Sequence, residues 1–336
     1  MRGPGGRLII VPSRCSLSGV AVLLVLLTGL AGCVASPPGT PDSGDRKGAL
    51  SSEVLGNPRT VDPCGLVSPE RLERFGAAER AGTVSLGYCL LHVRPEPDQL
   101  VQLAVGRLRY VDPEQLTSDN PVRRSGGLRL VREPPVPEHC TWRILFSDGV
   151  AMSVDADSLS GETSVGLCSL AEAGAREAAE TIREREVEHR SFPEGSLARA
   201  DPCELLSTET VRRVPGLERA DPRETPSRHK CSWGGEDIRV PSVELTHTAG
   251  EPPRSRDATS VTERTAGRRT VVDIVGDDPK VGLCSAETAH IPFGSPRSGD
   301  VEVAMLVVFL PEADGLRACE FARGLAEHVW PRLPER

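Results

Sequence analysis

The same arrangement of apolar and polar positions occurs twice along this chain. A cysteine preceded by Asp-Pro, Cys64 and later Cys203, is followed four residues on by a serine and eight and eleven residues on by apolar residues. A helix breaker comes next in both copies, Gly76 and Pro215. Because serine is a good N-cap and the apolar spacing fits one helical face, each repeat is predicted to begin with a short helix.

Segments of alternating apolar and polar residues follow each predicted helix and indicate antiparallel strands. In the first repeat these segments are 88–93, 99–110, 128–132, 140–146 and 150–155. In the second repeat they are 231–233, 242–248, 270–275, a segment led by Cys284, and 301–310. Trp142 and Trp233 fall in such strands close to cysteines, where a tryptophan is typical of a buried core rather than of a ligand platform.

Each repeat closes with apolar residues at helical spacing after its fourth cysteine. These are Ala171, Ala175, Ala178, Ala179 and Ile182 after Cys168, and Ala322, Ala326, Val329, Trp330 and Leu333 after Cys319. The predicted class is therefore α+β, with two tandem modules that each contain a short N-terminal helix, an antiparallel sheet and a C-terminal helix. Module one is expected over 61–190, a linker over 191–199 and module two over 200–336. The charged run 183–190 is expected to be a solvated helix end.

Eight cysteines divide evenly between the two modules, Cys64, Cys89, Cys140 and Cys168 in the first and Cys203, Cys231, Cys284 and Cys319 in the second. An even number in an exported chain predicts disulfides. Some histidines lie near cysteines, but the paired C-x-x-C spacing of a structural zinc site is missing, so no metal or cofactor is expected. Four cysteines allow three pairings, among which the sequence does not choose. We favour first with second and third with fourth.

The N-terminus has the pattern of a lipoprotein export signal over 1–32. A basic segment with Arg2, Arg7 and Arg14 precedes the apolar run 19–31, which is shorter than a spanning helix needs. Leu30-Ala31-Gly32-Cys33 then resembles a lipobox, which predicts Cys33 as the lipidated mature N-terminus on the extracytoplasmic face of the cell membrane. The alternatives are an uncleaved anchor or an ordinary signal peptide. Residues 33–60, rich in Pro, Gly and Ser, are predicted to form a flexible tether.

The net charge of the chain limits the classes of molecule that it is expected to bind. The whole chain carries −8, and the first 32 residues hold three arginines and no acidic residue, so the mature chain carries −11. An acidic envelope protein has little electrostatic reason to bind nucleic acid. The expected partners are the membrane, through the lipid on Cys33, and an envelope lipid or a membrane protein.

Several of these features together resemble an actinobacterial lipoprotein family known as domain-of-unknown-function 3558. They are the lipobox, the Asp-Pro-Cys helix starts at 62–64 and 201–203, the Cys231-Ser232-Trp233 strand and the cysteine-led final helix. The resemblance covers roughly 60–187 and 199–334, and module one departs from it with Cys89-Leu90-Leu91. It implies location and fold, and because the family has no established reaction it carries over no catalytic residue.

Enzyme motifs are missing from the sequence, including the nucleophile elbow, the zinc protease helix, the P-loop and the dinucleotide fingerprint. The seven histidines share no spacing across the repeat, and each is expected to be solvated or satisfied by a partner. The leading hypothesis is a non-enzymatic binding or sensing protein of the cell envelope. One alternative is a structural accessory protein. Another is an envelope hydrolase, which would need carboxylates such as Glu138, Asp155 and Glu244 to converge in one pocket.

Overall fold

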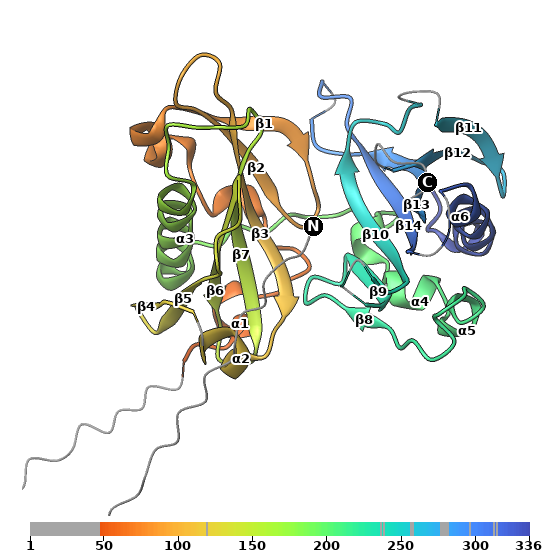
Figure 1. Ribbon diagram of the computed structural model, residues 1–336, viewed down its shortest axis with the longest axis horizontal. Coiled ribbons are helices and arrows are strands. Elements are labelled where there is room, and N and C mark those ends of the chain that lie inside the picture. Colours follow the sequence, from red (N-terminus) through yellow and green to blue (C-terminus); the bar gives the residue numbers. More distant parts are fainter. Residues whose placement is uncertain are drawn as a thin grey trace, which may run out of the picture. The chain divides into compact units, whose positions relative to one another are not determined.

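The computed structural model contains two seven-stranded antiparallel sheets, one in each half of the chain, and each sheet is covered by a helix (Figure 1). It describes residues 48–118, 120–235, 237, 239–255, 259–275, 282–295, 297–311, 313 and 315–336. These residues belong to one compact unit, Arg46–Arg336. The predicted α+β class with two sheet modules is confirmed.

Module one has the strand order β1-β2-β3-β7-β6-β5-β4. Its strands are β1 (Ala77–Val84), β2 (Cys89–Arg94), β3 (Val101–Tyr110), β4 (Val122–Ser125), β5 (Leu128–Arg132), β6 (His139–Leu145) and β7 (Val150–Ser158). Its helices are α1 (Ser51–Leu55), η1 (Pro63–Gly65), η2 (Pro69–Phe75), α2 (Pro113–Ser118) and α3 (Leu167–Glu184). Helix α3 packs on β3, β6 and β7 through an alanine-rich buried face, whose small side chains allow close approach to the sheet.

Module two repeats this architecture strand by strand. Its strands are β8 (Arg223–Glu224), β9 (Lys230–Gly234), β10 (Ser242–Gly250), β11 (Ser260–Thr265), β12 (Arg268–Ile274), β13 (Gly282–Pro292) and β14 (Val301–Leu310). Its helices are η3 (Leu197–Arg199), α4 (Pro202–Leu205), α5 (Thr208–Val211), α6 (Gly315–Val329) and η4 (Trp330–Arg332). The order β8-β9-β10-β14-β13-β12-β11 is that of module one with each strand number raised by seven, so the two modules share one topology.

Four disulfides join the eight body cysteines in the favoured order, Cys64–Cys89, Cys140–Cys168, Cys203–Cys231 and Cys284–Cys319. The first bond of each module ties the N-terminal helical segment to β2 or β9. The second bond ties β6 or β13 to the covering helix. Each bond therefore connects a helix to the sheet on which it packs. The predicted disulfides are confirmed.

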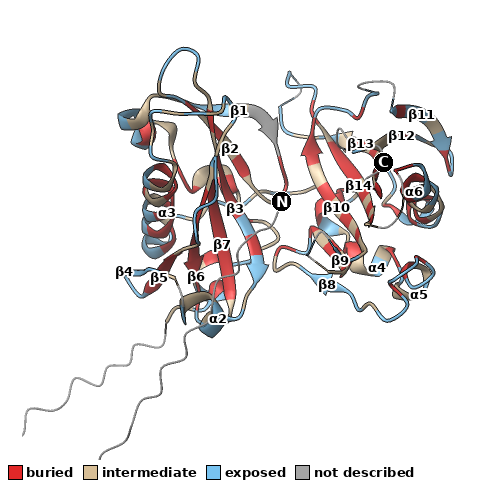
Figure 2. Ribbon diagram, in the orientation of Figure 1, coloured by how far each residue is buried: buried red, intermediate tan, exposed pale blue. Residues whose placement is uncertain are grey.

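The core of each module lies between its sheet and its helix, and Figure 2 shows buried residues concentrated along the central strands. Trp142 and Trp233 are 2% and 0% exposed, as predicted for core tryptophans. Their indole N–H groups donate to the carbonyl oxygen of Cys168 at 3.1 Å and to the hydroxyl of Thr208 at 3.2 Å. The polar N–H group of each buried tryptophan is therefore satisfied by a hydrogen bond.

The helix starts differ in detail from the prediction. Ser207 caps α5 by accepting from the backbone N–H of Thr210 at 3.2 Å, as expected. Ser68 makes no such side-chain cap for η2, and its backbone N–H instead donates to Glu177 at 2.9 Å. Helix α6 begins at Gly315, so Cys319 lies inside the helix and does not open it.

The predicted tether over 33–60 is too long at its C-terminal end. Ser51–Leu55 forms α1, and Leu55 is fully buried in the core of module one. The Ser51 hydroxyl also donates to Asp148 Oδ2 at 2.6 Å. Ala49 and Val54 also pack against this core, so a few apolar side chains in a polar stretch help to anchor the segment, and they are too few to form a recognisable hydrophobic pattern. The signal segment 1–32, Cys33 and the first part of the tether, up to residue 47, lie outside the described residues.

The segment between the modules is held by buried polar contacts. The expectation of a solvated run over 183–190 is wrong at Arg190, which donates to Asp62 Oδ1 at 2.8 Å and to the Ser85 carbonyl at 2.7 Å. In the linker, the carboxylate of Glu302 on β14 accepts from the Ser196 hydroxyl at 2.5 Å and from the Leu197 N–H at 2.6 Å. The linker is therefore fixed to module two by specific contacts.

Replacing Glu302 by alanine is expected to lower the free energy of unfolding by about 2 to 3 kcal/mol, because two buried donors lose their acceptor. Glu302 is 1% exposed, and Ser196 and Leu197 are 0% exposed. Urea unfolding of the mature chain measures the loss. Glu302→Gln, which keeps one acceptor oxygen, should lose about half as much. The control is Glu327→Ala, on the exposed side of α6. A loss no larger than the control's contradicts the prediction.

Candidate functional site

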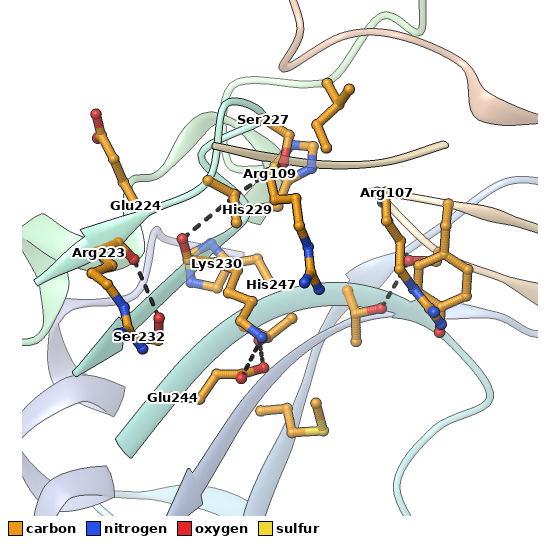
Figure 3. Close-up of a pocket in the computed structure, with 18 of the residues that line it drawn as sticks. Arg107, Arg109, Arg223, Glu224, Ser227, His229, Lys230, Ser232, Glu244 and His247 are labelled. Atoms are coloured by element: carbon orange, nitrogen blue, oxygen red, sulfur yellow. Dashed lines mark hydrogen bonds and ion pairs between the residues drawn. The ribbon is translucent and has the colours of Figure 1, made fainter. Parts of the chain in front are cut away.

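A cleft of about 860 Å³ is lined by residues of both modules (Figure 3). Module one contributes the β1–β2 turn and the C-terminal half of β3, and module two contributes β8, β9, β10 and Met305 of β14. Beside the cleft the modules are in contact. Leu86 packs with Ala198 and Ala249, and the hydroxyl groups of Ser85 and Thr248 lie 3.3 Å apart.

The walls of the cleft are built from equivalent positions of the two copies. Cys89 pairs with Val105 on β3, and Cys231 pairs with Leu245 on β10, which sets these strands in the same register. In that register three pairs of cleft residues correspond, Tyr88 with Lys230, Arg107 with Thr246, and Arg109 with Thr248. The same face of the sheet therefore lines the cleft in both modules. The side chains at equivalent positions differ between the two walls.

A β-bulge at Gly106 directs two arginines into this cleft. Leu103 and Val105 lie in the core, and strict alternation would bury residues 107 and 109 as well. The pairing of β3 with β7 shifts register between Val105 and Arg107, and Gly106 has a φ of 111°. A Cβ at Gly106 would stand 2.5 Å from Pro63 Cβ. The extra residue reverses the phase, so Leu108 returns to the core while Arg107 and Arg109 line the cleft.

Two of the basic side chains in the cleft are fixed by acidic neighbours. The Arg107 guanidinium lies 3.4 Å from Asp155 Oδ2 and 4.2 Å from the centre of the Tyr88 ring. Lys230 forms an ion pair with Glu244, which also accepts from the Thr246 hydroxyl at 2.8 Å. Figure 3 shows Arg107 on one side of the cavity and Lys230 with Glu244 on the other. The pairing holds their side chains in place without a ligand.

Two histidines of module two, His229 and His247, are buried at the side of the cleft that this module lines. His247 is 1% exposed, and its Nδ1 lies 2.9 Å from the carbonyl oxygen of Leu197, so this nitrogen donates. His229 is 4% exposed, and its ring lies close enough to the backbone of Ala198 for that group to raise its pKa against the effect of burial. Burial lowers the pKa of His229 to about 3, helped by the nearby His247 and Arg59, and burial lowers the pKa of His247 to about 4. Both rings are therefore neutral near pH 7.

These histidines and the cleft arginines were missed by sequence reasoning. The histidines had been expected to be solvated or satisfied, and nothing in their spacing shows that two strands of module two bring His229 and His247 together. The arginines had one available signal. Arg107-x-Arg109 follows a glycine in an otherwise apolar strand, and the equivalent positions of the second copy hold threonines.

The three carboxylates considered for a hydrolase do not converge. Glu244 lines the cleft, whereas Glu138 and Asp155 do not. Glu138 lies in the turn before β6 at a φ of 61°. Asp155 accepts from Thr141 at 2.8 Å and from Ser153 at 2.7 Å, and it pairs with Arg107. Each carboxylate has a separate structural environment, and the pocket that this hypothesis required is not formed by them.

Three polar side chains of module one are linked by hydrogen bonds in the order carboxylate, imidazole and hydroxyl, as in a catalytic triad. His139 Nδ1 lies 2.5 Å from Asp157 Oδ1, and His139 Nε2 lies 2.8 Å from the Thr141 hydroxyl. The Thr141 hydroxyl, however, donates to Asp155 at 2.8 Å and is 4% exposed. It therefore offers no proton to His139 and is closed to a substrate, so these three side chains are not arranged for nucleophilic catalysis.

Among the described residues, no group of three or more His, Cys, Asp or Glu side chains could hold a metal ion. Within the same part of the chain, no helix is both long and apolar enough to cross a membrane.

Comparisons with known proteins add little to this geometry. No family model matches the chain, and no curated protein matches it. Among solved structures, the chain aligns with the di-domain ARO/CYC StfQ from the steffimycin biosynthetic pathway at 14% identity and a TM-score of 0.15. The alignment covers 85% of this chain and 96% of that chain. So low a TM-score carries no argument about fold or activity.

Proposed function

We propose that this chain is a non-enzymatic binding protein of the cell envelope. In this proposal it is anchored by the lipid on Cys33 and takes up a ligand in the cleft between its two modules. The resemblance to the actinobacterial lipoproteins supports the same location.

The observation that carries the proposal is the cleft itself. Its volume of about 860 Å³ lies within the range of small-molecule sites. Equivalent strands of a duplicated module line it, and the bulge at Gly106 places charged side chains where strict alternation would have buried them. A face that served only to support the sheet would not need this register change.

A non-enzymatic role is supported by the surroundings of the polar groups. Asp155 and Glu244 have separate partners, Glu138 does not line the cleft, and the hydroxyl of Thr141 is buried and already donates. The four disulfides and the buried linker contacts instead favour a rigid frame that holds a preformed cavity.

A native mass spectrum of protein extracted gently from its own membranes tests the proposal. The expected mass corresponds to a chain that begins at Cys33, carries its lipid, lacks eight hydrogens for the four disulfides and holds one additional small molecule. Cys33→Ala should remove the mass of the lipid, because the predicted lipobox then has no thiol to carry it.

Thr246→Trp, which fills the cleft, should remove the additional mass. Thr262→Trp, on the exposed edge strand β11, should retain it and is the matched control. A lipidated monomer without any additional mass in the wild type contradicts the binding function. Retention of the mass in Thr246→Trp contradicts the assignment of the ligand to this cleft.

A further inference from the structure

Two arginines in the cleft have no acidic partner among the described residues, Arg109 on β3 and Arg223 on β8. The other charged side chains of the lining are paired, Arg107 with Asp155, Lys230 with Glu244, and Glu224 with Arg228. The cleft therefore presents two uncompensated positive charges, although the predicted mature chain carries −11. Two uncompensated guanidinium groups that line one cavity favour an anionic occupant.

The two arginines are accessible to a ligand. Both are exposed residues. Figure 3 shows the Arg109 side chain extending from β3 into the region between Lys230 and Arg107, and Arg223 on the β8 side of the same cavity. A guanidinium group presents a planar fork of N–H donors that matches a carboxylate or phosphate with two parallel hydrogen bonds.

The rest of the lining favours a hydroxylated ligand. Serine and threonine hydroxyls occupy much of the module-two wall, at Thr225, Ser227, Ser232, Thr246 and Thr248. Tyr88 and Tyr110 lie on the module-one side. Hydroxyl groups donate and accept, so this wall can exchange hydrogen bonds with several hydroxyls of a sugar or a polyol.

We propose that the cleft binds a small hydroxylated oxyanion, a polyol or sugar that carries a phosphate or carboxylate group and is attracted by the exposed guanidinium groups of Arg109 and Arg223. This inference rests on the proposed binding function and names the chemical class of its ligand. The two arginines select for a negative charge, and the serine and threonine hydroxyls form hydrogen bonds to the rest of the ligand.

Isothermal titration calorimetry of the mature chain at low salt tests this inference with three probes, glycerol 3-phosphate, glucuronate and uncharged glycerol. Arg109→Ala and Arg223→Ala should each weaken binding of the charged probe about tenfold, because each removes hydrogen bonds to a charged group. The control is Arg124→Ala on β4, which removes an exposed arginine outside the cleft. Preference for glycerol 3-phosphate over glucuronate would identify a phosphate site, and the reverse preference a carboxylate site.

Several results would overturn the inference. They are no binding of either charged probe at millimolar concentration, glycerol binding as tightly as the charged probes, or an equal loss in Arg124→Ala and the two cleft variants. Circular dichroism of each variant shows whether it is folded, and a variant that is folded and still binds normally counts against the arginine it removes. A neutral molecule seen in the native mass spectrum would leave the binding function standing and refute this inference alone.

Discussion

Replacing Cys284 and Cys319 together by alanine is expected to lower the free energy of unfolding by about 4 kcal/mol. The bond closes a loop of 35 residues, the longest of the four, and the chain-entropy relation gives about 4 kcal/mol for that length. It also joins β13 to α6, whose buried face contains Ala318, Ala322 and Ala326.

Urea unfolding of the mature chain, followed by tryptophan fluorescence, measures this loss. Trp233 and Trp330 report on module two, and Trp142 reports on module one. The equivalent variant in module one removes the Cys140–Cys168 bond, with a loop of 28 residues, and should lose slightly less. A loss below about 1 kcal/mol would contradict the entropic argument. A non-reducing peptide map that joined Cys284 to any cysteine other than Cys319 would contradict the pairing.

The repeat and its cysteine correspondences could be read from the sequence, because they depend on spacing along the chain. A competing alignment would pair the identical strings 165–169 and 281–285 and leave Cys140 without a counterpart. The structure supports the alignment that matches Cys140 with Cys284. Cys140 pairs with Ala156 on β7, and Cys284 pairs with Val308 on β14, which are equivalent positions of equivalent strands.

The edge strands were not predicted, for a physical reason. Ala77–Val84 and Ser260–Thr265 have little apolar alternation, and Val261 in the second is 47% exposed. An edge strand pairs on one side only, and its formation depends on backbone hydrogen bonds to a neighbour more than on its own side chains. Alternation of apolar and polar residues identifies strands that bury one face. It therefore did not identify β1 and β11.

The lining of the cleft could not be predicted from the sequence, since it depends on which sheet faces meet. Strict alternation assigns Arg107 and Arg109 to the core face, and only the bulge at Gly106 reverses that assignment. Likewise His229 and His247 are eighteen residues apart in the sequence, yet the backbone N–H of His247 donates to the His229 carbonyl at 2.7 Å. Register and bulges are properties of the assembled sheet, which is why this part of the site needed the structure.

The same two histidines predict that stability falls steeply on mild acidification. Burial lowers the pKa of His229 from 6.5 to about 3 and that of His247 from 6.5 to about 4. The unfolded chain therefore binds more protons than the folded chain once the pH drops below about 6.5, and it is favoured progressively until the folded-state pKa values are reached. Between about pH 7 and pH 5 each histidine should remove about 2 kcal/mol, so the pair should remove about 4 kcal/mol from the free energy of unfolding.

Urea unfolding of the mature chain at pH 7 and at pH 5 measures this effect, and non-titrating variants assign it. His247→Asn keeps a donor toward the Leu197 carbonyl, and His229→Phe replaces the titrating ring by an aromatic ring that carries no proton-binding group. Each variant should reduce the difference between the two pH values by about half, and both together should remove most of it. His328→Asn, on the exposed side of α6, is the matched control for the loss of a histidine. If the double variant loses as much stability on acidification as the wild type, the buried pair is not the cause.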